Sequence, residues 1–95
     1  GGTRVDDSSF TMNGGTIIKN SGNTKGAGIG CIGTSDINSM ITINGGKIYN
    51  NTATTSNGGI FIGNYCTYTN TNNQGVICEN TPTNEYETHT TCPAS

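Results

Sequence analysis

Gly15-Thr-Ile-Ile-Lys-Asn20, Gly46-Lys-Ile-Tyr-Asn-Asn51 and Gly75-Val-Ile-Cys-Glu-Asn80 are three copies of one pattern, Gly-Xaa-Ile-Xaa-Xaa-Asn. The copies begin at positions 15, 46 and 75, so that one repeat is about 30 residues long. A sequence that resembles itself at a period of roughly 20–50 residues is typical of solenoids, propellers and other repeat arrays. The pattern therefore predicts that the chain folds as a stack of similar units.

Similarity between the copies continues on both sides of this pattern. Before it, Phe10-Thr-Met-Asn-Gly-Gly15 aligns with Ile41-Thr-Ile-Asn-Gly-Gly46. The third copy, 70–75, keeps a Thr, an Asn and the last Gly but lacks the two large apolar residues. After the pattern, Gly28-Ile-Gly-Cys-Ile-Gly33 resembles Gly59-Ile-Phe-Ile-Gly63. Each repeat thus consists of three recurring blocks.

These blocks are typical of short strands separated by corners. Phe10 and Met12 alternate with polar residues, as do Ile41 and Ile43, which is the period-two pattern of a half-buried strand. Gly-Gly and Asn-Gly pairs stand between the blocks, where they permit the positive φ of a sharp corner. No block has an apolar stripe of helical period. We therefore predict an all-β fold, a right-handed parallel β-helix with about three coils of about 31 residues.

The length of the chain favours a single domain, a β-solenoid over residues 1–95. The coils are expected at roughly 10–40, 41–69 and 70–95, with residues 1–9 as a partial first coil. The chain has no initiating Met and begins in the middle of a repeat at Gly1-Gly2, so we interpret it as a processed form or a piece of a longer protein. No amphipathic capping helix is visible at either end.

Equivalent positions in successive coils should stack into ladders about 4.8 Å apart. We expect an inward isoleucine ladder of Ile17, Ile48 and Ile77. An asparagine ladder should stand at a corner, with amides hydrogen-bonded along the stack as in cross-β arrays. Its members are Asn20, Asn51 and Asn80. A row of Thr11, Thr42 and Thr71 should point outward.

Composition excludes several functional classes. Only four basic residues are present and the net charge is −2, which argues against a nucleic-acid partner. No apolar run is long enough to span a membrane, and no charged and apolar leader is visible. Apolar residues make up 29% of the chain, which is little for a globular core. A thin β-helix core needs little apolar mass, because backbone ladders between coils satisfy most polar groups.

Four cysteines in so small a chain suggest an oxidising compartment, and hence an extracellular location. Cys31, Cys66, Cys78 and Cys92 allow three pairings, among which the sequence does not decide. Cys66 and Cys92 are a candidate pair, because their separation is close to one coil, whereas Cys78 is expected to point outward. A zinc site is the alternative, but no CxxC spacing exists and His89 is the only histidine.

No arrangement of residues predicts catalysis, a cofactor or a metal. Acid–base hydrolysis needs two carboxyls at a defined separation, and no repeat alignment places a base opposite an acid. His89 lies in a Thr-rich tail, without a residue that would orient it as a base. The sequence Asn50-Asn51-Thr52 is a sequon, which makes Asn50 a candidate glycosylation site. We therefore expect that the chain is not an enzyme.

The string from Phe10 to Asn20, followed by Gly28-Ile-Gly-Cys-Ile, resembles the β-helix repeats of bacterial autotransporter-type adhesins and polymorphic outer-membrane proteins. Those repeats show Gly-Gly-Xaa-Ile with an Asn a few residues later. The resemblance covers residues 2–80 and implies a right-handed parallel β-helix outside the cell, used for adhesion or as a stalk. No catalytic residues are carried over, because the matching positions are structural.

The sequence therefore predicts an extracellular structural or adhesive module. Uncapped coils offer free strand edges, so the expected partners are copies of itself, stacked head to tail into a filament, and surface glycans. A carbohydrate-binding or pectate-lyase-like β-helix is an alternative. Its candidate stacking residues are the four tyrosines, Tyr49, Tyr65, Tyr68 and Tyr86. An ice-binding threonine surface, suggested by Thr67-Tyr-Thr69, is a further alternative.

Overall fold

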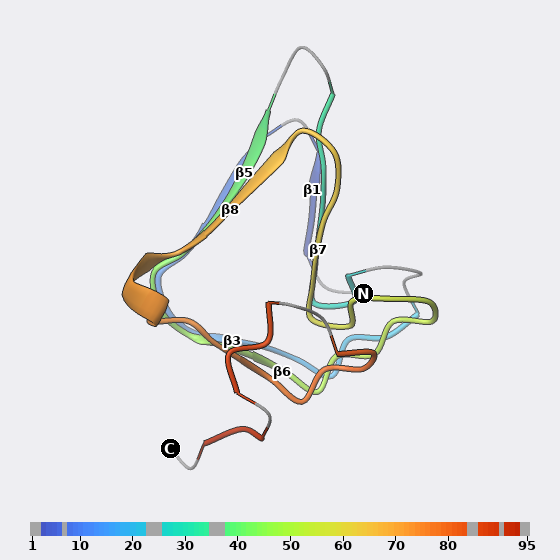
Figure 1. Cartoon of the computed structure of the whole chain (residues 1–95), viewed down its shortest axis with the longest axis vertical. Coiled ribbons are helices and arrows are strands. Elements are labelled where there is room, and N and C mark those ends of the chain that lie inside the picture. The colour runs from blue at the N-terminus through green and yellow to red at the C-terminus, as the bar shows by residue number, and fades with distance from the viewer. Residues whose placement is uncertain are drawn as a thin grey trace.

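Three parallel sheets of three strands each form the fold, and the chain visits them in the same order three times. This computed structural model describes residues 3–6, 8–22, 26–34, 38–83, 86–89 and 91–93. Figure 1 shows the strands along the three sides of a triangle, with the later repeat lying over the earlier ones. Apart from one turn of 3-10 helix, η1, the described elements are all strands. The prediction of an all-β fold is confirmed.

Most of the strands coincide with the recurring apolar blocks of the sequence. Each sheet takes one strand from each repeat, so that neighbours in a sheet are three strands apart along the chain. The first sheet contains β1 (Thr3–Asp6), β4 (Ile29–Ile32) and β7 (Ile60–Ile62). The second sheet contains β2 (Ser9–Met12), β5 (Ser39–Ile43) and β8 (Cys66–Asn70). The third sheet contains β3 (Thr16–Ile18), β6 (Lys47–Tyr49) and β9 (Val76–Cys78).

The core consists of side chains that recur at equivalent positions. Ile17, Ile48 and Ile77 are in register, as predicted, and Ile48 and Ile77 are fully buried. Stacking like residues on strands about 4.8 Å apart lets each side chain pack against its copy in the next repeat. The other fully buried isoleucines come from the first and second sheets, and they are Ile29, Ile41, Ile43 and Ile60.

The predicted asparagine ladder is present at the corner that follows the third sheet. Asn20 donates its amide Nδ2 to Asn51 Oδ1 over 3.0 Å, and Asn51 donates Nδ2 to Asn80 Oδ1 over 2.9 Å. The residue before each asparagine has a positive φ, at Lys19, Asn50 and Glu79. This repeated left-handed corner brings each amide into line with the next. Buried Asn51 and Asn80 therefore satisfy one another instead of losing hydrogen bonds in the core.

The third repeat departs from the predicted alignment. Residues 70–75 were aligned with 41–46, but in the structure Ile41 pairs with Tyr68 and Ile43 with Asn70. The extra length is taken up by η1 (Thr71–Asn73), after which Val76 is again in register with Lys47. The outward threonine row consequently contains Thr69 and not Thr71, because Thr11 pairs with Thr42 and Thr42 with Thr69.

The disulfides differ from the predicted pair Cys66–Cys92. Cys31 is bonded to Cys66, and Cys78 is bonded to Cys92. The prediction assumed that the chain continues around another coil to reach Cys92. Instead, the C-terminal segment lies at the edge of β9, where His89 forms a parallel bridge with Cys78 and Cys92 is bonded to Cys78. For the same reason Cys78, which was expected on the outside, has no exposed surface.

The C-terminal end of the sheets, a candidate functional site

The chain after the third repeat lies beside β9 of the third sheet and close to β8 of the second. Its described residues, 86–89 and 91–93, are called the tail here; in Figure 1 the red end of the chain passes the side of the triangle that contains β3 and β6, and the C-terminus lies outside the triangle. Thr88 donates its backbone N–H to Ile77 O over 2.7 Å, and Ile77 donates its N–H to Thr88 Oγ1 over 2.9 Å. His89 forms a parallel bridge with Cys78. The tail thus takes the place that a further strand would occupy beside β9.

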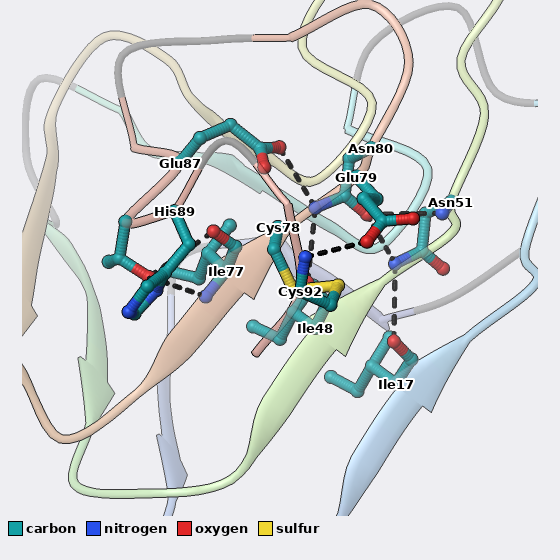
Figure 2. The surroundings of a disulfide bond; sticks show 11 residues. Ile17, Ile48, Asn51, Ile77, Cys78, Glu79, Asn80, Glu87, His89 and Cys92 are labelled. Atoms are coloured by element: carbon teal, nitrogen blue, oxygen red, sulfur yellow. Dashed lines mark hydrogen bonds between the residues drawn. A yellow bond between two sulfur atoms is a disulfide. The ribbon is translucent and has the colours of Figure 1, made fainter. Parts of the chain in front are cut away.

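Glu87 ends the asparagine ladder. Asn80 donates Nδ2 to Glu87 Oε1 over 2.9 Å, so that a carboxylate oxygen stands where the amide oxygen of another ladder asparagine would be expected (Figure 2). Burial raises the pKa of the Glu87 carboxyl, and hydrogen bonds from the side chain and backbone of Asn80 oppose that rise. The other oxygen, Oε2, is buried and has no hydrogen-bond partner among the described residues.

A covalent bond and a hydrogen bond fix the far end of the tail. Cys92 is bonded to Cys78 of β9, and its backbone N–H donates to Glu79 Oε2 over 2.6 Å. Figure 2 shows both contacts close to Ile48 and Ile77 of the core. The bond closes a loop with a sequence separation of 14, and a cross-link of this length removes much of the freedom of an unfolded tail.

A pocket lies between this tail and the second sheet. It has a volume of about 310 Å³ and six lining residues, Tyr68, Asn70, Asn73, Tyr86, Glu87 and Thr88. The rings of Tyr68 and Tyr86 meet edge to face, with centroids 4.7 Å apart. Burial raises the pKa of the Tyr68 hydroxyl, which a hydrogen bond with Asn70 opposes. Asn70 also holds the corner, since it accepts from Gly75 N and donates to Gly75 O.

The structure brings together only some of the residues singled out from the sequence. Of the four tyrosines, Tyr68 and Tyr86 share the pocket, whereas Tyr49 lies under the Lys47 ammonium and Tyr65 is half exposed. Asn50, the candidate glycosylation site, is exposed at its corner. The threonine row has no second threonine row beside it, because the neighbouring column consists of Ser9, exposed Met40 and Thr67.

The carboxylates and the histidine do not form a common centre within the described part of the chain. His89 Nδ1 lies 2.8 Å from Thr88 Oγ1, while Glu79 and Glu87 are engaged with Cys92 and Asn80. In the described residues no group of three or more metal-ligating side chains is present. Asp7, Asp36 and Glu85 lie outside the described residues, as does the side chain of Asp6.

Sequence reasoning missed the tail as a structural element. Counting coils predicts that residues 70–95 form another coil, so periodicity did not predict that the tail lies beside β9. The one usable signal was Cys92, since a cysteine shortly after a repeat suggests that the chain is fastened back onto it.

Comparison with known proteins returned no matching family model, curated protein or solved structure. The resemblance to adhesin repeats therefore stays a prediction. None of the described helical segments is sufficiently long and apolar for a membrane span.

Proposed function

We propose that this chain is a right-handed parallel β-solenoid that serves outside the cell as a structural and adhesive module, without catalytic activity. The observation that carries the proposal is the in-register recurrence of Ile17, Ile48 and Ile77 and of the asparagine ladder beside them. In repeat proteins such contacts between neighbouring repeats supply the stability, and the exposed surface is available for binding other molecules. The two disulfides support an oxidising, extracellular setting.

Self-association is the second part of the proposal, and the tail limits it by covering one strand edge. β8 is an edge strand of its sheet, and on the opposite side of the fold β1, β2 and β3 are edge strands of theirs. Such edges are templates for pairing with another chain. The outer edge of β9, however, is occupied by Thr88 and His89. A second copy can continue all three sheets at this end only when the tail is displaced.

The assembly state of two disulfide variants tests this proposal. The double variant Cys78→Ser/Cys92→Ser frees the tail, and Cys31→Ala/Cys66→Ala is the matched control that keeps the tail fastened. Sedimentation velocity and electron microscopy should show small particles for the unmodified chain and the control, and filaments for the freed-tail variant. A folded freed-tail variant that stays monomeric at high concentration would contradict the self-association, as would equal assembly of the control.

A further inference from the structure

The pocket between β8 and the tail has a lining that is unusual for this molecule. Every one of its six residues carries a hydrogen-bonding group, and two of them also present an aromatic ring. Elsewhere the interior of the fold is built mainly from isoleucines. At the positions where earlier repeats place Met12 and Ile43, the last repeat has Asn70, and it has Tyr68 where they have Phe10 and Ile41. The exchange makes the end of the core polar and aromatic.

The charge and volume of this pocket restrict what it can accept. No Lys or Arg is among the lining residues, and Glu87 adds a carboxylate, so an anionic ligand such as a phosphate would be repelled. A volume of about 310 Å³ is at the lower end of the range for small-molecule sites, roughly 300–1,000 Å³. Too few apolar groups line it for a lipid chain. A small, neutral molecule with many hydroxyl groups fits these limits.

The hydrogen-bonding groups of the pocket match such a molecule. Asparagine amides both donate and accept, hydroxyl groups do the same, and a carboxylate accepts only. Asn70 and Asn73 bring such groups to the pocket from the end of β8 and from η1, and Glu87 brings its carboxylate from the tail. Tyr68 and Tyr86, whose rings meet edge to face at 4.7 Å, both line the pocket and add some apolar surface beside its polar groups, which suits the mixed C–H and hydroxyl groups of a sugar.

We propose that this pocket binds a neutral saccharide, either one pyranose ring or the end of a short chain. The inference does not depend on the structural function proposed above, because it rests on Tyr68, Asn73 and Glu87 rather than on the repeats. It also does not require self-association. A chain that does not assemble can still bind a sugar in this pocket, and a chain that assembles can lack sugar binding.

NMR titration of the oxidised 95-residue chain tests the saccharide site. The probes are the methyl glycosides of glucose, galactose and mannose, and N-acetylglucosamine, with inorganic phosphate, glucuronate and choline as comparison ligands. At least one neutral sugar should cause saturable shifts that are confined to the amides of residues 68–73 and 86–88. The expected dissociation constant is in the millimolar range, which corresponds to about 4 kcal/mol.

Two variants connect such binding to the pocket without disturbing the tail. Asn73→Gly removes an exposed side chain at a position with φ of 57°, which glycine adopts easily, and Tyr68→Phe removes one hydroxyl. Each should weaken sugar binding at least about fivefold, equivalent to about 1 kcal/mol. Tyr49→Phe, a hydroxyl deletion outside the pocket, should leave it unchanged. Absence of saturable shifts with every neutral sugar, preferred binding of phosphate, glucuronate or choline, or unchanged affinity in both pocket variants would overturn the proposal.

Discussion

Asn80 donates its side-chain amide to Glu87 Oε1 over 2.9 Å, just as Asn51 donates its own amide to Asn80 Oδ1 over 2.9 Å. One carboxylate from the tail therefore ends a row of amides that begins two repeats earlier. A stack of repeats needs polar ends, because an open stack leaves ladder groups without partners. Glu87 and Thr88 provide such an end without a capping helix.

The first prediction concerns the asparagine ladder. Asn51→Ala should lower the free energy of unfolding by roughly 2–4 kcal/mol, because it removes partners from Asn20, from Asn80 and from the carbonyl of Ile17 in a buried setting. Urea denaturation followed by circular dichroism measures this loss. Asn44→Ala is the matched control, since Asn44 donates to Asn13 in an exposed pair over the same sequence separation. The control should cost less than about 1 kcal/mol.

A second prediction concerns the glycine that stands beside the ladder. A Cβ added at Gly59 would lie 2.7 Å from Nδ2 and 3.0 Å from Cγ of Asn80, whose amide is held by its partners on either side. Gly59→Ala should therefore destabilise the fold by roughly 1–3 kcal/mol through overpacking. At Gly14 an added Cβ meets nothing within 4 Å, so Gly14→Ala should change stability by less than about 1 kcal/mol. Equal losses in the two variants would argue against this close contact.

The third prediction follows from the raised pKa of Glu87. A carboxyl whose folded-state pKa is above its unfolded value binds a proton more tightly in the folded state. Its stabilising contribution is therefore complete below the unfolded pKa and is lost as the pH rises through the folded pKa. Glu87→Gln should make the chain slightly more stable than the unmodified one at neutral pH, because no charge is then desolvated. The gain should be a few tenths of a kcal/mol, since the carboxyl is only partly buried.

Thermal unfolding of the two chains across acidic to neutral pH measures this difference. The advantage of Glu87→Gln should shrink as the pH falls through the pKa of Glu87 and vanish once its carboxyl is protonated. A gap that is constant over the whole range, or one that widens in acid, would be incompatible with a desolvated carboxylate at the end of the ladder.

A fourth prediction concerns the disulfides. Peptide mapping without reduction should find Cys31 linked to Cys66 and Cys78 linked to Cys92, and no peptide that links Cys66 to Cys92. Loop entropy predicts that removing the second bond costs about 3 kcal/mol and the first about 4 kcal/mol, because the first closes the longer loop. Only the loss of Cys78–Cys92 should make the tail susceptible to brief proteolysis.

The sequence was a good guide wherever a residue recurs. The isoleucine ladder, the asparagine ladder and the strands that carry them could be predicted, because a parallel stack places equivalent residues over one another and leaves a period in the sequence. The register of β8 could not be predicted in the same way. Its inward residues, Tyr68 and Asn70, differ in kind from Ile41 and Ile43, and η1 adds length after them.

The position of the tail and its pocket could not be predicted from the repeat for a different physical reason. Thr88 holds Ile77 through one hydroxyl and one backbone N–H, and Glu87 holds Asn80 through one oxygen. Single polar contacts of this kind leave no pattern along the chain. The tail returns to the edge of β9 instead of forming another coil, which is why counting coils pairs Cys92 with Cys66 although it is bonded to Cys78.

Residue-resolved amide hydrogen exchange of the oxidised chain tests most directly whether the tail replaces a further strand beside β9. The backbone N–H groups of Ile77 and Thr88 each have a partner in the other residue, over 2.9 Å and 2.7 Å. Both should exchange far more slowly than in an unstructured peptide, and Thr88 should lose its protection when Cys78 and Cys92 are replaced by serine. Exchange of Thr88 at the unstructured rate in the oxidised chain would contradict the account.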